Sequence, residues 1–336
     1  MNSQLQNRTP VAAETFPGLF WCSDLISTRD LGPQGVEAVL HLTELMKSRP
    51  SVFQRALAGK QMVMFFEKPS LRTRLTFEAG MTSLGGTAMF VDQTKSKLDA
   101  RESLSDIAHN LERWVDVIVL RTFAQETLVG MAEHASVPVI NALSDMEHPC
   151  QALADYFTLK ERFGDVRKIC LAYVGDGNNV AHSLMLTAAC LGSSIRVATP
   201  KGYEPNAEIV ADALRIARLT GAQIRLLTEP HAAVAGVDAV YTDAWASMGQ
   251  EEESEKRARI FPPYQVNRKL MAHAAPHAVF MHCLPAHRGQ EVTDEVMDSE
   301  NSVIFDQAEN RMHVQKAILY LLLGGSVRLP ARSAHA

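Results

Sequence analysis

The sequence contains few cysteines, and their spacing argues against two common kinds of site. Its five cysteines stand far apart, at positions 22, 150, 170, 190 and 283. Their number is odd and no two form a Cys-x-x-Cys pair, so neither a disulfide framework nor a structural zinc site is expected. This pattern fits a reducing compartment, and we expect a cytoplasmic protein.

The sequence also lacks long apolar runs and clusters of basic residues. No segment reaches the roughly 20 apolar residues that a membrane-spanning helix needs. Residues 1–16 are polar, contain a proline and lack the apolar core of a signal peptide, so we expect a loose tail there. The 33 Lys and Arg residues are scattered and the net charge is −5. We therefore expect neither a nucleic-acid nor a membrane partner, but a small anion.

Short apolar segments alternate along the chain with segments whose apolar residues recur every three or four positions. Such alternation is typical of parallel sheets flanked by helices. The predicted strands cover residues 61–66, 87–91, 115–120, 137–141, 169–174, 194–199, 223–227, 239–242 and 278–282. The predicted helices cover residues 23–31, 33–48, 71–84, 102–113, 128–134, 149–163, 181–191, 206–220 and 309–323.

We expect an α/β protein of two domains, each with a mostly parallel sheet flanked by helices and joined by interdomain helices. A chain of 336 residues, 46% of them hydrophobic, can bury two cores. The first domain is expected at residues 17–148 and the second at 149–308. A C-terminal helix at 309–330 is expected to pack back on the first domain. Internal repeats and low-complexity segments are lacking.

The segment Ser-Leu-Arg-Thr-Arg at residues 70–74 follows the first predicted strand of that domain and begins a helix, with Ser70 as its N-cap. A helix N-terminus has unpaired N–H groups and a partial positive charge. Hydroxyl and guanidinium groups added there suit a phosphate-like anion. The alternative is an ordinary capped surface helix in which Arg74 pairs with Glu78.

Other polar residues follow the predicted strands, where open parallel sheets bind their ligands. The first domain offers Arg121 and the segment 148–151, His-Pro-Cys-Gln. The second offers residues 175–179, 243–249 and 282–285, which supply a carboxylate, amides and a thiol. This division suggests a cleft for group transfer between an anion and a cationic partner.

Each of these residues also has a plainer interpretation. Arg121 could be a surface charge, His148 a capping or core histidine, and Cys283 a small core residue. Gly-Asp-Gly at 175–177 is half of a dinucleotide-binding fingerprint and therefore weak. The acidic run 251–253 is most simply a solvated face.

The four motifs at 70–74, 148–151, 243–249 and 282–285 occur in the order, and roughly at the spacing, seen in ornithine carbamoyltransferases. The resemblance extends from about Leu25 to Leu323. The first two motifs mark the wider superfamily, which includes the aspartate enzymes. The last two resemble the ornithine branch, because the aspartate branch has a proline where Cys283 stands.

The resemblance implies a set of ligands for each substrate. Carbamoyl phosphate would be bound by Ser70, Leu71, Arg72, Thr73, Lys97, Arg121, His148, Gln151, Cys283, Leu284 and Arg311. Ornithine would be bound by Asn179, Asp243, Ser247 and Met248, with Asp243 on the α-ammonium group. The catalytic residues would be Arg121, His148 and Cys283.

Two positions depart from the family's usual pattern. Lys97 stands where many ornithine enzymes have Gln or His, in a loop that serves the neighbouring subunit; it could equally be an exposed loop lysine. Leu71 stands where threonine is more frequent, but its side chain is not a ligand. Arg311 is expected at the start of the last helix.

The resemblance further implies an enzyme of arginine metabolism that transfers the carbamoyl group of carbamoyl phosphate to the δ-amine of L-ornithine, giving L-citrulline and phosphate. It implies a homotrimer or a multiple of trimers, with active sites at subunit interfaces. No metal or organic cofactor is expected, because a mixed anhydride is already activated. The alternatives are carbamoyl transfer to aspartate, N-acetylornithine or putrescine, an NAD-dependent oxidoreductase, and a non-catalytic homologue.

Overall fold

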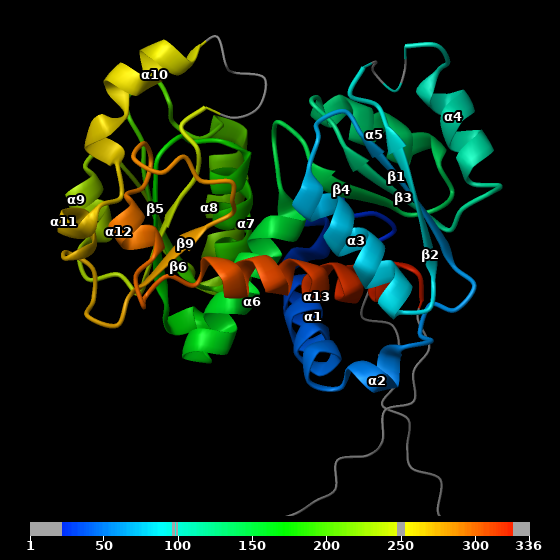
Figure 1. Cartoon of the computed structure of the whole chain (residues 1–336), viewed down its shortest axis with the longest axis horizontal. Coiled ribbons are helices and arrows are strands. Elements are labelled where there is room, and N and C mark those ends of the chain that lie inside the picture. The colour runs from blue at the N-terminus through cyan, green and yellow to red at the C-terminus, as the bar shows by residue number, and fades with distance from the viewer. Residues whose placement is uncertain (1–21, 96–97, 99, 247–252, 325–336) are drawn as a thin grey trace, which may run out of the picture.

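The computed structural model describes residues 22–95, 98, 100–246 and 253–324. Within them the chain forms two parallel sheets (Figure 1). The first, in strand order β2-β1-β3-β4, comprises β1 (Gln61–Phe66), β2 (Thr87–Asp92), β3 (Val117–Arg121) and β4 (Val139–Leu143). The second, in order β7-β6-β5-β8-β9, comprises β5 (Cys170–Val174), β6 (Ser194–Ala198), β7 (Ile224–Leu227), β8 (Ala239–Thr242) and β9 (Val279–His282).

Helices flank both sheets, so the α/β architecture with two parallel-sheet domains is confirmed. The longer helices are α1 (Thr28–Ser48), α3 (Leu71–Ser83), α4 (Leu104–Leu111), α5 (Gln125–His134), α6 (Pro149–Phe163), α7 (Asn179–Leu191), α8 (Ala207–Thr220) and α13 (Ile304–Leu322). Shorter ones, which the sequence pattern did not predict, are α2 (Pro50–Phe53), α9 (Pro230–Val234), α10 (Ser254–Ile260), α11 (Arg268–Met271) and α12 (Asp294–Met297). None of the described helices is both long and apolar enough to cross a membrane.

The prediction of a helix over residues 23–31 is wrong for residues 23–27, which precede α1. Leu25 pairs with β4 instead: its backbone N–H donates to Val139 O at 2.9 Å, and Leu25 O accepts from Asn141 N at 2.8 Å. The helix α1 begins only at Thr28, after the capping residue Ser27. It is kinked at Gly32, whose φ of 58° lies in the left-handed region.

Two long helices, α6 and α13, connect the domains. Helix α6 runs between the last strand of the first sheet and the first strand of the second, and α13 packs against α6, α1 and α3 (Figure 1). The last helix begins at Ile304 rather than at residue 309. Arg311 therefore lies two turns into α13 instead of at its start, a correction to the sequence-based expectation.

The hydrophobic core continues from one domain to the other. A single cluster of buried side chains joins Met64 of β1 and Phe77 of α3 to Tyr156 of α6 and to Tyr173 of β5. Two further clusters cover the opposite faces of the sheets. Because parallel strands all end at the same edge of each sheet, this arrangement brings two sets of strand ends together between the domains.

Candidate active site

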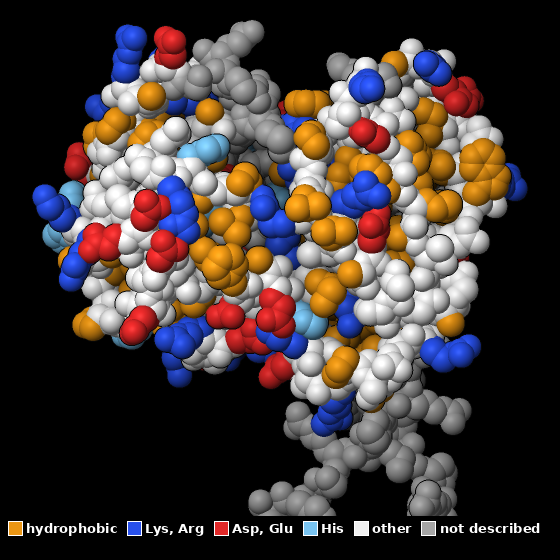
Figure 2. Space-filling model, viewed as in Figure 1, with side chains coloured by type: hydrophobic (Ala, Val, Ile, Leu, Met, Phe, Trp, Pro, Cys, Tyr) orange, Lys and Arg blue, Asp and Glu red, His pale blue; other side chains and the backbone are white. Residues whose placement is uncertain are grey.

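A cavity of about 370 Å³ lies between the domains, where the strand ends of both sheets meet. Figure 2 shows basic side chains in the furrow between the two lobes. The residues that line the cavity come from both domains: Lys68, Pro69, Ser70, Leu71, Arg72, Thr73, Arg121, Leu143, His148, Asn179, Val180, Asp243, Ala244, Ala246, Cys283, Leu284, Pro285, His287 and Arg311. Most of the site residues that the resemblance implies are among them.

The start of helix α3 forms one wall. The Ser70 hydroxyl accepts a hydrogen bond from the Thr73 backbone N–H at 3.3 Å, as an N-cap does, and donates to Thr73 Oγ1 at 2.9 Å. Arg72 lines the cavity, whereas Arg74 pairs with Glu78 at 2.9 Å. The Arg74–Glu78 pair of the plainer interpretation is therefore present, while Arg72 faces the cavity, because residues two apart on a helix point to different faces. The binding of an anion by this segment stays a prediction.

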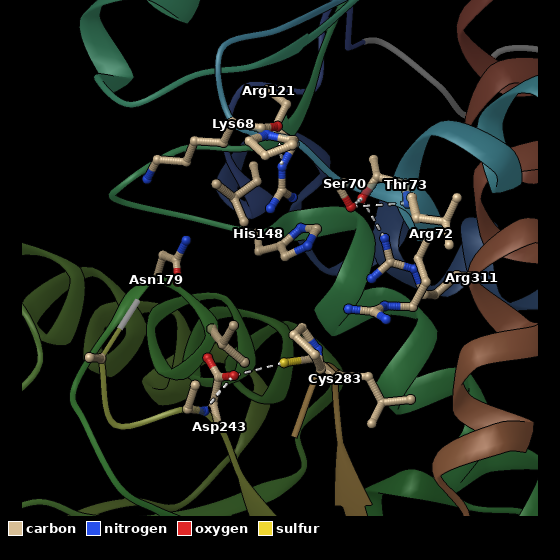
Figure 3. A pocket seen from close by; sticks show the side chains of 18 of the residues that line it. Lys68, Ser70, Arg72, Thr73, Arg121, His148, Asn179, Asp243, Cys283 and Arg311 are labelled. Atoms are coloured by element: carbon tan, nitrogen blue, oxygen red, sulfur yellow. Dashed lines mark hydrogen bonds between the residues drawn. The ribbon is translucent and has the colours of Figure 1, made fainter. Parts of the chain in front are cut away.

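Three guanidinium groups converge on this wall, from Arg72, Arg121 and Arg311 (Figure 3). Arg121 is buried at the end of β3, where its Nε donates to Lys68 O at 3.2 Å. Burial, together with the charges of Arg311 and Arg72, lowers the pKa of Arg121 to about 9. Burial and like charges thus destabilise the cationic cluster, and an anion bound there would relieve the repulsion.

Arg311 joins this wall from the last helix. Its Nη2 donates to Thr73 Oγ1 at 2.8 Å and its Nη1 donates to Gln151 Oε1. The Thr73 hydroxyl at the start of α3 is thereby fixed by a residue far along the chain. Arg311 Nε is buried and has no hydrogen-bond partner among the described residues.

His148 is the N-cap residue of α6, with Pro149 in the first turn. Its backbone N–H donates to Ser183 Oγ at 2.8 Å, which fixes the helix start against α7. The side chain lines the cavity and is buried. Burial and the charges of Arg311 and Arg121 lower its pKa well below the usual value, so the imidazole is neutral near pH 7.

The opposite wall carries a carboxylate and a thiol (Figure 3). Asp243, after β8, accepts hydrogen bonds from Asn178 Nδ2 and from the Ala244 backbone N–H, each at 2.8 Å. Cys283, after β9, donates its S–H to Asp243 Oδ1 at 3.0 Å. Burial and the adjacent carboxylate of Asp243 raise the thiol's pKa well above its usual value. Cys283 is therefore a hydrogen-bond donor to Asp243.

Asn179 and Leu284 complete this wall. The Asn179 amide donates to Ser144 O at 2.5 Å, which leaves its second amide hydrogen for a ligand. Leu284 adopts a φ of 61°, unusual for a residue other than glycine, and its backbone N–H donates to His282 Nδ1 at 2.9 Å. Leu284 can therefore meet a ligand through its carbonyl oxygen.

Gln151 does not line the cavity. It is buried behind Arg311, and its amide Nε2 donates to Asp155 at 2.7 Å while its Oε1 accepts from Arg311. Its assignment as a direct ligand stays a prediction. The sequence-based interpretation missed Lys68, which lines the cavity. Its position just after β1 is the strand-end signal that could have found it.

Three predicted site residues, Lys97, Ser247 and Met248, lie outside the described residues, as does the tail at 1–16. Their proposed roles stay predictions.

Asp243, His282 and Cys283 offer three ligand atoms within 4.8 Å of one another, a spacing that a metal ion could use. However, both ring nitrogens of His282 already have partners: Nδ1 accepts from Leu284 N, and Nε2 lies 3.3 Å from Glu291 Oε1. A metal would have to displace one of them, so this donor set fits a metal poorly.

The Gly-Asp-Gly turn at 175–177 is explained by packing rather than by a dinucleotide. A Cβ on Gly177 would lie 2.3 Å from Pro205 N, so the backbone contact alone requires glycine there. Asp176 pairs with Arg257 at 2.8 Å. The first N–H groups of α7 are capped by Asn178, whose Oδ1 accepts from Val180 N at 3.0 Å.

The fold and the cavity define a two-domain α/β protein whose domains present an arginine-bearing wall and a carboxylate-bearing wall to each other. Comparison with known proteins agrees. Residues 23–161 match the carbamoyl-P binding domain of aspartate/ornithine carbamoyltransferase, and residues 167–322 match its Asp/Orn binding domain. The chain belongs to the aspartate/ornithine carbamoyltransferase family.

Similar proteins and structures cover nearly the whole chain. The ornithine carbamoyltransferase of Thermococcus kodakarensis is 49% identical over 304 residues, which are 90% of this chain and 96% of the relative. The structure of the Pyrococcus furiosus ornithine carbamoyltransferase is 48% identical, covers 90% of this chain and 97% of its own, and has a TM-score of 0.87. The structure of an anabolic ornithine carbamoyltransferase from Campylobacter jejuni is 37% identical. The match covers 89% of this chain and 98% of that structure's chain, with a TM-score of 0.85.

Proposed function

We propose that this protein transfers the carbamoyl group of carbamoyl phosphate to the δ-amine of L-ornithine, forming L-citrulline and phosphate. The observation that carries the proposal is the cavity in which Arg72, Arg121 and Arg311 face the Asp243–Cys283 pair. Relatives about 49% identical over 90% of the chain are named ornithine carbamoyltransferase, which supports the same assignment.

Carbamoyl phosphate binds to the first-domain wall. Its phosphate takes the backbone N–H groups and hydroxyls at the start of α3, with the guanidinium groups of Arg72 and Arg121 neutralising its charge. Arg311 holds Thr73 in place for this contact. The carbamoyl group then points across the cavity toward Cys283 and the Leu284 carbonyl oxygen.

Ornithine binds to the second-domain wall. Its α-ammonium group pairs with Asp243, and Asn179 contributes its free amide hydrogen to the carboxylate. An N-acetylated amine has no positive charge for Asp243, and putrescine has no carboxylate for Asn179. The residues of this wall therefore favour ornithine over both of these amines.

The neutral δ-amine attacks the carbonyl carbon of carbamoyl phosphate. A C–N bond forms, the C–O bond to phosphate breaks, and phosphate leaves with the bonding electrons. The amine nitrogen loses one proton, which the departing phosphate takes up. Arg121 and the neutral His148 donate hydrogen bonds to the carbonyl oxygen as negative charge develops there. Cys283 keeps its proton and orients Asp243, so it acts as a donor rather than as a base.

The active assembly is a homotrimer or a multiple of trimers, and the protein is cytoplasmic. An exposed apolar surface beside the cavity supports self-association: Leu71 is 72% exposed, Leu75 51%, and Met89 on the edge strand β2 40% (Figures 1 and 2). A neighbouring copy would cover it and bring its Lys97 to the site. All five cysteines are free, which fits a reducing compartment.

Mixed trimers test whether the site is shared. Subunits carrying Lys97→Ala and subunits carrying Arg72→Ala are each expected to have low activity. Mixing them restores part of it, because some sites then contain both intact residues. No recovery after subunit exchange contradicts a shared site.

The reaction itself is tested by following ¹³C-labelled carbamoyl phosphate by NMR in the presence of ornithine and the protein. The label is expected to move into the ureido group of citrulline, with one phosphate released per citrulline. Release of labelled carbonate without a ureido signal contradicts the proposal.

A further inference from the structure

Four buried side chains form a polar cluster where α6 crosses α13. Gln151 and Asp155 stand one turn apart on α6, and Gln307 and Arg311 stand one turn apart on α13. All four are at most 4% exposed. Helix residues four positions apart share a face, so each helix presents one matched pair to the other.

The hydrogen bonds run through this cluster without a break. Asp155 Oδ1 accepts from Gln151 Nε2 and from Gln307 Nε2, each at 2.7 Å. Gln151 Oε1 accepts from Arg311 Nη1. One carboxylate oxygen of Asp155 therefore accepts hydrogen bonds from the side-chain amides of both glutamines, one on each helix.

Each end of the cluster reaches one wall of the cavity. On the first-domain side, Arg311 Nη2 donates to Thr73 Oγ1 at 2.8 Å. On the second-domain side, Gln307 Oε1 accepts from the His282 backbone N–H at 3.0 Å, one residue before Cys283. Gln307 Nε2 also donates to the Tyr241 hydroxyl at 3.2 Å, two residues before Asp243.

We infer that Gln307 is a positioning residue that couples the two substrate sites, by fixing the strand ends that carry Asp243 and Cys283 relative to Arg311 through Asp155. This inference rests on the proposed function and adds to it. An anion bound on the first-domain wall attracts Arg311 and so shifts the hydrogen-bonded cluster. Through Gln307 this shift reaches the second-domain wall, where the amino acid binds. By thermodynamic linkage, ornithine binding then strengthens carbamoyl phosphate binding by the same factor.

A purely structural role for Gln307 predicts something different. Losing a buried polar contact would then lower the free energy of unfolding, but each ligand would change the other's affinity by the same factor as in the wild type. The ratio of affinities measured with and without the second ligand therefore separates coupling from stability.

The test uses two unreactive ligands. L-Norvaline has the carboxylate and ammonium of ornithine but lacks the δ-amine, and phosphonoacetamide replaces the bridging oxygen of carbamoyl phosphate with a methylene. The norvaline dissociation constant is measured by calorimetry without and with saturating phosphonoacetamide, and the coupling factor is the ratio of the two. Thermal unfolding is recorded in parallel.

The variants are Gln307→Met, which removes every hydrogen bond of this side chain, and the milder Gln307→Asn, which keeps the amide but is one methylene too short. Gln315→Met is the control. Gln315 lies on the same helix, is 1% exposed, and neither of its amide atoms has a hydrogen-bond partner among the described residues. The same substitution there removes no link between the domains.

We expect phosphonoacetamide to tighten norvaline binding to the wild-type protein and to Gln315→Met by the same factor. In Gln307→Met we expect that coupling factor to fall on the order of tenfold, and in Gln307→Asn to fall by less. If Gln307→Met does not fold, Gln307→Asn provides the test. A wild-type factor of one, or an unchanged factor in both Gln307 variants, overturns the inference. Wild-type citrulline formation is assayed separately: its absence refutes the proposed function, whereas its presence with unchanged coupling refutes only the role of Gln307.

Discussion

Arg311 and Thr73 are 238 positions apart in the sequence, yet Arg311 Nη2 donates to Thr73 Oγ1 at 2.8 Å. The proposed anion-binding wall is therefore complete only once the last helix has packed back on the first domain. A hydroxyl at the start of α3 is held by a guanidinium from α13, so the proposed phosphate site depends on the packing of α13.

Replacing Arg72 with alanine tests the anion-binding wall. We expect a loss of kcat/KM for carbamoyl phosphate of about 10²–10³-fold, the usual cost of removing one preorganised donor to a developing charge. Arg74→Ala is the matched control, because Arg74 stands two residues away on the same helix and pairs with Glu78 at its surface. The control is expected to change little, since exposed ion pairs contribute about 0–1 kcal/mol. Near-normal kinetics for Arg72→Ala would refute the assignment of this wall.

Replacing Asp243 with asparagine tests the amino-acid wall. The variant keeps the size of the side chain but removes the charge that pairs with the α-ammonium group. A hydrogen bond to a charged group contributes about 1.5–3 kcal/mol, so we expect KM for ornithine to rise roughly 10- to 100-fold while KM for carbamoyl phosphate changes little. Steady-state kinetics with each substrate varied in turn measures this. An unchanged ornithine saturation curve rules out the pairing.

The pH dependence of turnover tests the role of Cys283. Burial and the Asp243 carboxylate raise the pKa of this thiol well above its usual value, so it stays protonated from pH 6 to 9. A serine also donates a hydrogen bond and also stays protonated. Cys283→Ser is therefore expected to lower kcat without changing the shape of the pH–rate profile between pH 6 and 9. Loss or displacement of a limb in this profile would show that Cys283 titrates as a base.

The stability of Asp155→Asn should differ from that of the wild type in a pH-dependent way. Burial raises the pKa of Asp155 from 3.8 to about 7, and this effect outweighs the opposing hydrogen bonds from Gln151, Gln307 and Tyr241 and the charge of Arg311. The folded state then binds this proton more tightly than the unfolded state.

Asp155 therefore makes the free energy of unfolding fall as pH rises from about 4 to about 7. Asparagine does not titrate, so the variant lacks this loss of stability. We therefore expect the free energy of unfolding of the variant minus that of the wild type to rise from pH 5 to pH 7 and to level off above. Urea unfolding at pH 5, 6, 7 and 8 measures it. Parallel stability curves for the two proteins would contradict the raised pKa.

The strands and the strand-end residues could be predicted from the sequence because their signals are local. Apolar runs mark the parallel strands, Ser70 marks the start of α3, and Pro149 marks that of α6. Strand ends in parallel sheets share one edge, so Arg121 and Asp243 could be assigned to a site without knowing how the domains pack.

Other features depend on contacts far along the chain. Leu25 pairs with β4, and residues 23–27 precede α1 rather than joining it. The pairing with a distant strand decides this. Helix α13 begins after Val303, which makes no side-chain cap, so the usual Ser, Thr or Asp signal is missing. Whether Gln151 faces the cavity or another helix is set by the packing of α13, because Arg311 occupies its Oε1.

The central claim is tested most directly by an acceptor comparison. Product formation from carbamoyl phosphate is measured side by side with L-ornithine, N-acetyl-L-ornithine, putrescine and L-aspartate, under the same conditions. We predict citrulline with ornithine at a kcat/KM well above that for the other three amines. Preferred use of another amine, or no carbamoyl transfer to any of the four, would contradict the proposed function.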